Sequence, residues 1–233
     1  MATVAAEPIV ALDVESASSA FALVRQLGDT CGFYKVGQEL FTAAGPDVVR
    51  GLRELGHRVF LDLKFHDIPT TVRGAMRSAR ALGATLATVH GSGGSAMLAA
   101  AVEGGGTECG VLAVTILTSL DRVALAEAWG RPVIDIGAEV ARLAIVAASS
   151  GAHGVVCSGH EANVVRAALG DRLATLVPGI RFAEEAAHDQ SRVTTPAAAA
   201  AAGARYLVLG RAVTHAVDPA AAMRRVHHEL GRA

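Results

Sequence analysis

The sequence is poor in aromatic residues, with one tryptophan, two tyrosines and six phenylalanines among 233 residues. Proteins that bind single-stranded nucleic acid commonly stack the bases on aromatic side chains, and this chain offers few of them. The formal net charge is −1, so the protein has no general attraction to nucleic acid or to an anionic membrane surface. Both observations argue against a nucleic-acid-binding protein.

Long apolar runs and cysteines are also scarce. No apolar stretch reaches the roughly 18 residues that a membrane span needs, and no signal-peptide pattern is visible, so a cytoplasmic protein is expected. The cysteines Cys31, Cys109 and Cys157 are far apart and odd in number, which predicts buried free thiols rather than a disulfide framework. No set of histidines, cysteines and carboxylates has metal-ligand spacing, so no metal site is predicted.

Short apolar runs rich in branched residues do recur, about every 25 to 30 residues, with helical patterns between them. One such helical stripe contains Val72, Met76 and Ala79 and is closed by Gly83, whereas residues 104–106 (Gly-Gly-Gly) are interpreted as a flexible turn. Eight alternations in 233 residues predict an α/β protein, a (β/α)₈ TIM barrel forming a single domain over residues 1–233. The eight predicted strands are Ile9–Leu12, Phe33–Val36, Val59–Leu63, Thr85–Val89, Val111–Val114, Gly154–Cys157, Leu176–Val177 and Tyr206–Leu209.

The most informative segment is the decapeptide from Asp62 to Thr71, Asp-Leu-Lys-Phe-His-Asp-Ile-Pro-Thr-Thr. Alternate residues of a strand point to the same side, so Asp62 and Lys64 are expected to project together from the end of the third strand, with Asp67 in the loop beyond. Charges are costly at the end of a hydrophobic strand unless they are paired. A structural ion pair covering a strand end is the simpler interpretation, and polar residues at the other strand ends favour a reactive site instead.

In a TIM barrel the chemistry is carried out at the carboxyl ends of the strands. Asp13, Lys35 and His90 lie at the ends of the first, second and fourth predicted strands. His90 is interpreted as a hydrogen-bonded structural residue rather than a base. The loops after the seventh and eighth strands commonly bind phosphate in this fold, and they carry Arg181 and Gly210-Arg211. The polar loop after Arg181 is long, which fits a lid over a bound ligand.

These residues resemble the orotidine 5′-phosphate decarboxylase family in its bacterial, single-function form. The resemblance covers nearly the whole chain, from about Ile9 to Asp218-Pro219, and the central decapeptide is its most specific part. The other matching motifs are Ala-Leu-Asp13, Tyr-Lys35-Val-Gly, Val-Thr-Ile-Leu-Thr118-Ser, Pro-Gly-Ile-Arg181, Asp-Gln190 and Gly210-Arg211. The alignment of residues 103–111 and 182–191 with the family is less secure.

The resemblance implies loss of carbon dioxide from orotidine 5′-phosphate to give uridine 5′-phosphate (UMP), the last step of de novo pyrimidine synthesis, without cofactor or metal. Lys64 would stabilise and then protonate the carbanion at C6 of the pyrimidine, within a charge network of Lys35, Asp62, Lys64 and Asp67. Asp67 and Thr71 would reach into the neighbouring site of a homodimer. Substrate binding would fall to Asp13, Lys35 and Asp62, to Thr71 and Thr118, and to Arg181, Gln190, Gly210 and Arg211.

Two other functions share these motifs in part. One is a metal-assisted sugar-phosphate decarboxylase or isomerase of the same barrel superfamily, which has the Asp-x-Lys-x-x-Asp pattern but needs further acidic ligands for its ion. Apart from Asp13 and the pair Asp62 and Asp67, no acidic residue stands out as a ligand for such an ion. The other is a barrel that binds a nucleotide without catalysis, which would be expected to have lost Lys64 or one of its aspartates.

Overall fold

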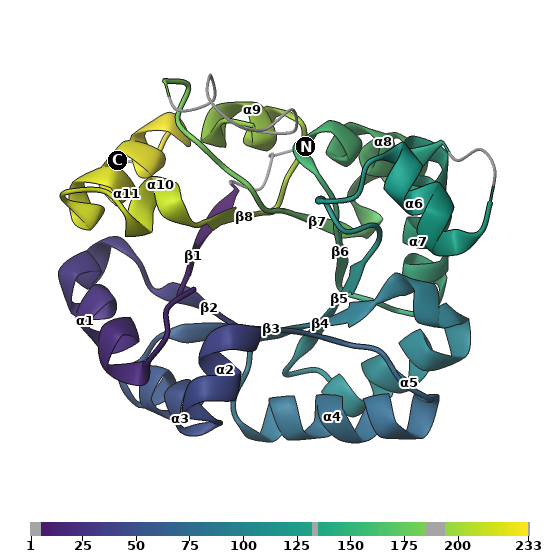
Figure 1. Ribbon diagram of the computed structural model, residues 1–233, viewed down its shortest axis with the longest axis horizontal. Coiled ribbons are helices and arrows are strands. Elements are labelled where there is room, and N and C mark those ends of the chain that lie inside the picture. Colours follow the sequence, from purple (N-terminus) through teal and green to yellow (C-terminus); the bar gives the residue numbers. More distant parts are fainter. Residues whose placement is uncertain (1–5, 132–134, 185–193, 233) are drawn as a thin grey trace.

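The computed structural model describes residues 6–131, 135–184 and 194–232. Eight parallel strands pair in sequence order, and β1 pairs with β8, so the sheet closes into a barrel (Figure 1). The predicted (β/α)₈ fold class is therefore confirmed. The strands are β1 (Glu7–Ala11), β2 (Phe33–Gly37), β3 (Arg58–Phe65), β4 (Leu86–His90), β5 (Gly110–Val114), β6 (Gly154–Val156), β7 (Ala174–Val177) and β8 (Tyr206–Leu209).

Helices surround the barrel on its outside (Figure 1). The stripe predicted from Val72, Met76 and Ala79 forms the buried face of α4 (Pro69–Ala81), which begins with proline at its first turn and is followed by Gly83 at φ 81°. The other α-helices are α1 (Ala17–Leu27), α2 (Gln38–Ala44), α3 (Asp47–Glu54), α5 (Gly94–Gly105), α6 (Arg122–Trp129), α7 (Ile136–Ser149), α8 (Gly159–Leu169), α9 (Pro196–Ala201), α10 (Arg211–Thr214) and α11 (Pro219–Glu229).

The glycines at 104–106 do not form the predicted flexible turn. Gly104 and Gly105 are the last two residues of α5, both are buried, and only Gly106 follows the helix as its cap. A Cβ atom on Gly104 would lie 2.4 Å from the carbonyl oxygen of Arg73 in α4. The glycine therefore allows two helices to approach closely, and this packing requirement cannot be read from the local sequence.

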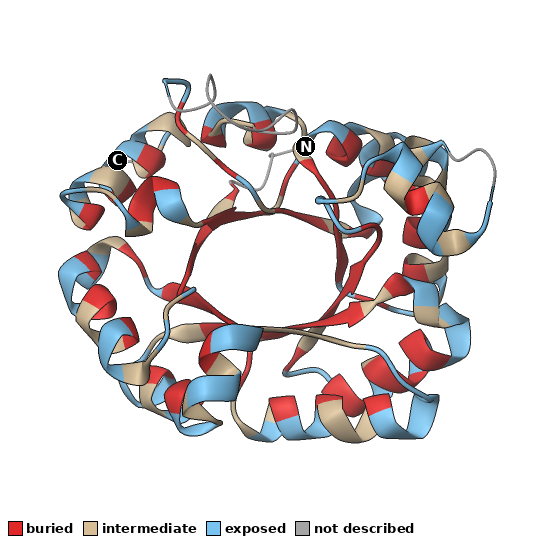
Figure 2. Ribbon diagram, viewed as in Figure 1, coloured by how far each residue is buried: buried red, intermediate tan, exposed pale blue. Residues whose placement is uncertain are grey.

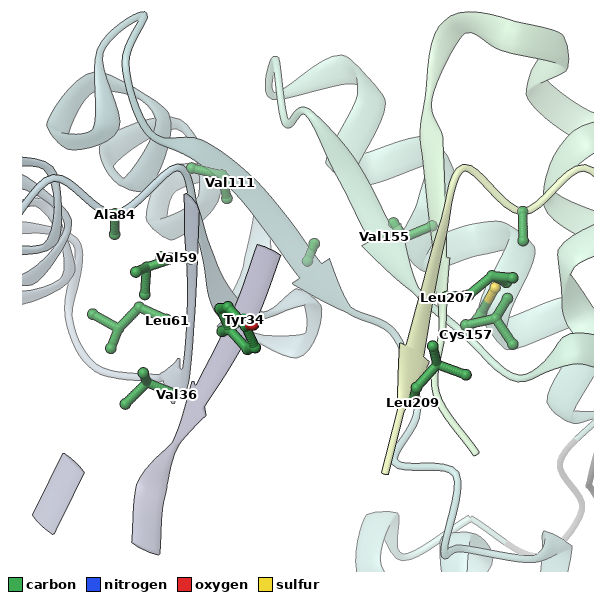
Figure 3. Packing of buried hydrophobic residues seen from close by; sticks show 14 of the residues in the cluster. Tyr34, Val36, Val59, Leu61, Ala84, Val111, Val155, Cys157, Leu207 and Leu209 are labelled. Atoms are coloured by element: carbon green, nitrogen blue, oxygen red, sulfur yellow. The ribbon is translucent and has the colours of Figure 1, made fainter. Parts of the chain in front are cut away.

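Two apolar layers stabilise the barrel. Inside it, residues at every second strand position form one cluster, which includes Phe33, Phe60 and Val208. The alternate residues, among them Tyr34 and Leu61, pack outward against the helices (Figure 3). The strands are accordingly buried on both faces, and the exposed positions lie on the outer sides of the helices and in the loops (Figure 2).

Polar contacts occupy the amino-terminal end of the barrel. Arg58 pairs with Glu7, and its guanidinium lies 4.2 Å from the centre of the Phe33 ring. His153 Nε2 lies 3.0 Å from the Tyr206 hydroxyl oxygen. These contacts join β1, β3 and β8 where the strands begin, at the end of the barrel opposite Lys35 and Asp62.

The three cysteines are buried free thiols, as predicted. Burial raises the pKa of Cys109 to about 12 and that of Cys157 further still, so these thiols stay protonated near neutral pH. Within the described ranges, no helix combines the length and the apolar character needed to cross a membrane.

Candidate active site

Strand alternation carries the apolar interior of the barrel into a polar layer at the carboxyl end. Phe33 on β2 and Phe60 on β3 belong to the interior cluster. Two residues further along the same strands stand Lys35 and Asp62, which therefore face the same interior. The predicted clustering of charged side chains at this end is found in the structure.

Four of these side chains form a continuous row of alternating charge, here called the charge row: Asp13, Lys35, Asp62 and Lys64. Lys35 Nζ lies 2.7 Å from Asp13 Oδ1 and 3.7 Å from Asp62 Oδ2. Lys64 Nζ lies 2.9 Å from Asp62 Oδ1. Each ammonium thus has a carboxylate partner, which offsets the cost of removing it from water.

Burial within the charge row is uneven. The side chains of Lys35 and Asp62 are only 10% and 14% exposed, whereas that of Lys64 is 29% exposed. Lys64 is therefore the ammonium within easier reach of a bound ligand. Gly37 leaves space for the ion pair of Lys35 and Asp13, because a Cβ atom there would lie 2.9 Å from Lys35 Nζ and 3.1 Å from Asp13 Oδ1.

The backbone at Lys64 departs from a regular strand. Its φ of 52° makes it the one non-glycine residue with positive φ in the described part of the chain. The pairing of β3 with β4 also shifts register between Leu61 and Phe65. Simple strand alternation, the predicted reason why Asp62 and Lys64 meet, is thus wrong in detail. Their contact depends on a left-handed residue that costs roughly 1–2 kcal/mol.

Sequence reasoning missed Thr88 on β4. This side chain is fully buried and contacts both Asp62 and Lys64 through its hydroxyl group. The available signal was a polar residue inside the apolar strand Leu-Ala-Thr-Val-His, two positions before His90.

His90 lies at the end of β4 with its ring centre 5.2 Å from that of His66. Burial lowers the pKa of His90, and the neighbouring His66 and Lys64 lower it further. The imidazole is therefore mainly neutral at neutral pH. Its role as a structural residue rather than a base stays a prediction.

Asp67 does not join the charge row of its own chain. It is exposed, its carboxylate accepts a hydrogen bond from the Ile68 backbone N–H at 2.6 Å, and it forms no salt bridge with any described residue. Ile68 is 66% exposed, and Thr71, in the first turn of α4, is exposed too. These three side chains are thus exposed in the single chain.

The predicted phosphate residues lie at the ends of two neighbouring strands. β7 pairs with β8, so Arg181, beyond β7, and Gly210-Arg211, directly after β8, follow adjacent strands. Gly179 at φ 74° turns the chain between β7 and Arg181. Thr118 is exposed in the loop after β5. Gln190 and most of the predicted lid lie outside the described residues.

The described start of that loop is attached to α11. The Arg225 guanidinium lies 4.1 Å from the centre of the Phe182 ring and donates to both carboxylate oxygens of Glu184, at 2.9 and 2.8 Å. These bonds hold the pKa of Glu184 below its ordinary value. At the far side of the loop, the Arg181 backbone N–H donates to the Thr194 carbonyl at 3.1 Å. Arg181 is therefore held by its backbone next to the end of β7.

No three described histidine, cysteine, aspartate or glutamate side chains converge in a way that could hold a metal ion. The charge row is instead an ammonium–carboxylate arrangement. It can place a positive charge and a transferable proton at one point on a bound molecule.

Comparison with known proteins agrees with this geometry. The model of the orotidine 5′-phosphate decarboxylase / HUMPS family matches residues 7–226. The chain belongs to this family. Its relatives include the orotidine 5′-phosphate decarboxylases of Anaeromyxobacter dehalogenans, 52% identical with 93% of this chain and 94% of the relative covered, and of Nitratidesulfovibrio vulgaris, 49% identical with 97% of each covered.

Solved structures of the family have the same fold. The orotidine 5′-phosphate decarboxylase of Lactobacillus acidophilus superposes with a TM-score of 0.86 at 37% identity, covering 97% of this chain and 99% of that one. The enzyme of Pyrococcus horikoshii superposes with a TM-score of 0.78 at 26% identity, covering 97% and 100%. Family membership thus extends over the whole barrel, the charge row included.

Proposed function

We propose that this chain decarboxylates orotidine 5′-phosphate to UMP, the last step of de novo pyrimidine synthesis, as a carboxy-lyase that uses no cofactor. The observation that carries the proposal is the Lys64 ammonium, held 2.9 Å from Asp62 at the carboxyl end of the barrel. The level of identity to named decarboxylases supports the choice of substrate.

The proposed chemistry needs a cation fixed at one carbon atom. The bond between C6 of the pyrimidine and its carboxylate breaks, carbon dioxide leaves, and the electron pair stays on C6. Lys64 stabilises this negative charge electrostatically and then transfers an ammonium proton to C6, and its neutral amine later takes a proton from water. Asp62 lies beside the departing carboxylate and holds Lys64 in place, and Lys35 balances the charge of Asp62.

The remaining residues bind the rest of the substrate. Asp13 and Lys35 bind the ribose hydroxyls, and Thr118 binds the pyrimidine edge. Arg181, Gln190, Gly210 and Arg211 bind the phosphate. Binding energy from this remote group favours a closed complex in which C6 is aligned with Lys64.

We further propose a homodimer in which Asp67 and Thr71 enter the neighbouring site. The exposure of both residues and of Ile68 supports this arrangement, as does the lack of a salt bridge to Asp67 within the described chain. A carboxylate from the partner would then complete the surroundings of Lys64.

The direct test is turnover of orotidine 5′-phosphate by the purified protein in EDTA. We expect full conversion to UMP at a rate that the chelator does not reduce, because no proposed step uses a metal ion. Absence of turnover, with activity on a sugar phosphate that EDTA abolishes, would support the metal-assisted alternative. Tight binding of UMP without any turnover would support a non-catalytic nucleotide-binding barrel.

Replacement of Arg211 by alanine tests the position of the phosphate. Loss of a charge-assisted contact should weaken UMP binding by about 1.5–3 kcal/mol and lower turnover as well. Calorimetry of UMP binding measures the effect. Arg205 precedes β8 at the other end of the strand, so Arg205→Ala is the matched control and should leave the affinity unchanged. Equal affinities of wild type and Arg211→Ala would show that the phosphate binds elsewhere.

A further inference from the structure

The hydroxyl of Thr88 links the two central members of the charge row. It accepts a hydrogen bond from the Lys64 backbone N–H at 2.9 Å and donates one to Asp62 Oδ1, also at 2.9 Å. A hydroxyl has a single proton, so accepting from the amide leaves that proton for the carboxylate. The same Asp62 oxygen receives the Lys64 ammonium at 2.9 Å. Thr88 therefore contacts Lys64 at its backbone directly and at its ammonium through Asp62.

The irregular pairing of β3 with β4 explains why a side chain is needed at this point. Leu61 pairs with Ala87, and Phe65 pairs with Val89. Three residues of β3 thus stand opposite the single residue Thr88, and Lys64 among them is left-handed. The amide of Lys64 cannot use a regular ladder carbonyl there, and a buried amide without an acceptor is costly. The threonine hydroxyl supplies that acceptor.

We infer that Thr88 is a positioning residue for the decarboxylation: it holds Lys64 in its left-handed conformation and orients Asp62, so that the ammonium is directed at C6. This inference rests on the proposed function, because it assumes that Lys64 is the group that acts at C6. Thr88 itself need not touch the substrate.

Substitution by valine removes the hydroxyl while nearly conserving the volume of the side chain. For Thr88→Val we expect kcat to fall about 10- to 100-fold, since small misplacements of a reacting group have effects of this size. The affinity for UMP should change less than about twofold, because the phosphate residues are on other strands. Thr88→Ser keeps the hydroxyl and should restore kcat to within about threefold of wild type.

A matched control comes from Thr175, another buried strand threonine. Its hydroxyl donates to the Gly203 carbonyl at 3.1 Å, and it lies on β7, which supplies no member of the charge row. Thr175→Val should lose a buried hydrogen bond but keep kcat. If Thr88→Val does not fold, Thr88→Ala also removes the hydroxyl, and its comparison with Thr88→Ser replaces that of the valine variant.

A second measurement observes the Lys64 amide directly. Lys35 and Lys64 are the only lysines of the sequence, so protein labelled with ¹⁵N-lysine gives two backbone amide signals. In Thr88→Val the Lys64 amide should exchange with solvent at least about tenfold faster than in wild type, and in Thr88→Ser it should stay protected. The Lys35 amide serves as the internal reference.

The outcomes separate the inference from the proposed function. If the wild-type protein does not decarboxylate orotidine 5′-phosphate, the proposed function fails. If it does, and Thr88→Val matches its kcat and its Lys64 exchange rate, the inference is overturned while the function stands. Equal losses of kcat in Thr88→Val and Thr175→Val would overturn it too, because they would indicate a general effect of removing a buried hydroxyl.

Discussion

Replacing Lys64 with alanine should reduce turnover of orotidine 5′-phosphate by at least about 10⁴-fold, because the variant loses both the cation at C6 and the proton donor. The protein should still fold, since the lysine side chain is partly exposed. Alanine at position 64 would have the same left-handed backbone conformation as lysine, so the substitution adds no backbone strain. Single-turnover measurement of UMP formation gives the rate, and circular dichroism together with UMP binding shows whether the barrel is intact.

Two further variants sharpen this test. Arginine at position 64 keeps the positive charge but does not release a proton near neutral pH, so Lys64→Arg should also be inactive if proton transfer is required. Arg50→Ala removes an exposed cation of α3 that pairs with Asp47, and it should retain full activity. A folded Lys64→Ala protein with a substantial fraction of wild-type turnover would refute the proposed mechanism.

Asp67→Ala should also be inactive, and mixing it with Lys64→Ala should restore activity. If Asp67 serves the neighbouring site, each mixed dimer has one site with both substitutions and one with neither. Random exchange makes about half of the dimers mixed, so about a quarter of all sites should recover. The measurement is turnover after mixing, with native mass spectrometry to follow the exchange of subunits.

The same experiment has a clear contrary outcome. If mass spectrometry shows mixed dimers while turnover stays at the level of the separate variants, Asp67 acts within its own chain. The homodimer and the decarboxylase function would be compatible with that result, but a site shared between subunits would not. A sample of Lys64→Ala alone, taken through the same exchange procedure, gives the background turnover.

The barrel could be predicted from the sequence because its signals are local. Each strand is a short apolar run, and strand alternation alone places Lys35 and Asp62 on the inner face beyond Phe33 and Phe60. The meeting of Asp13, Lys35 and Asp62 is predictable as well, since parallel strands bring their carboxyl ends to one edge of the sheet.

The unpredicted features depend on how separate elements meet. The bonds of Thr88 arise from a shift in register between two strands, and register is not encoded in either strand alone. The approach of Gly104 to Arg73 is likewise a property of two packed helices. The role of Asp67 would depend on a second copy of the chain, so the residue pattern alone could supply only a prediction.

At Lys64 the backbone conformation that positions the ammonium is left-handed, and this conformation costs the folded state free energy. Glycine adopts such a conformation without the steric cost, so Lys64→Gly would relieve this strain and remove the ammonium that pairs with Asp62. A laboratory selection that rewards heat tolerance alone does not act to keep the ammonium at position 64, and it accepts folded but inactive proteins. Directed evolution of this enzyme for use at high temperature must couple survival to product formation in every round.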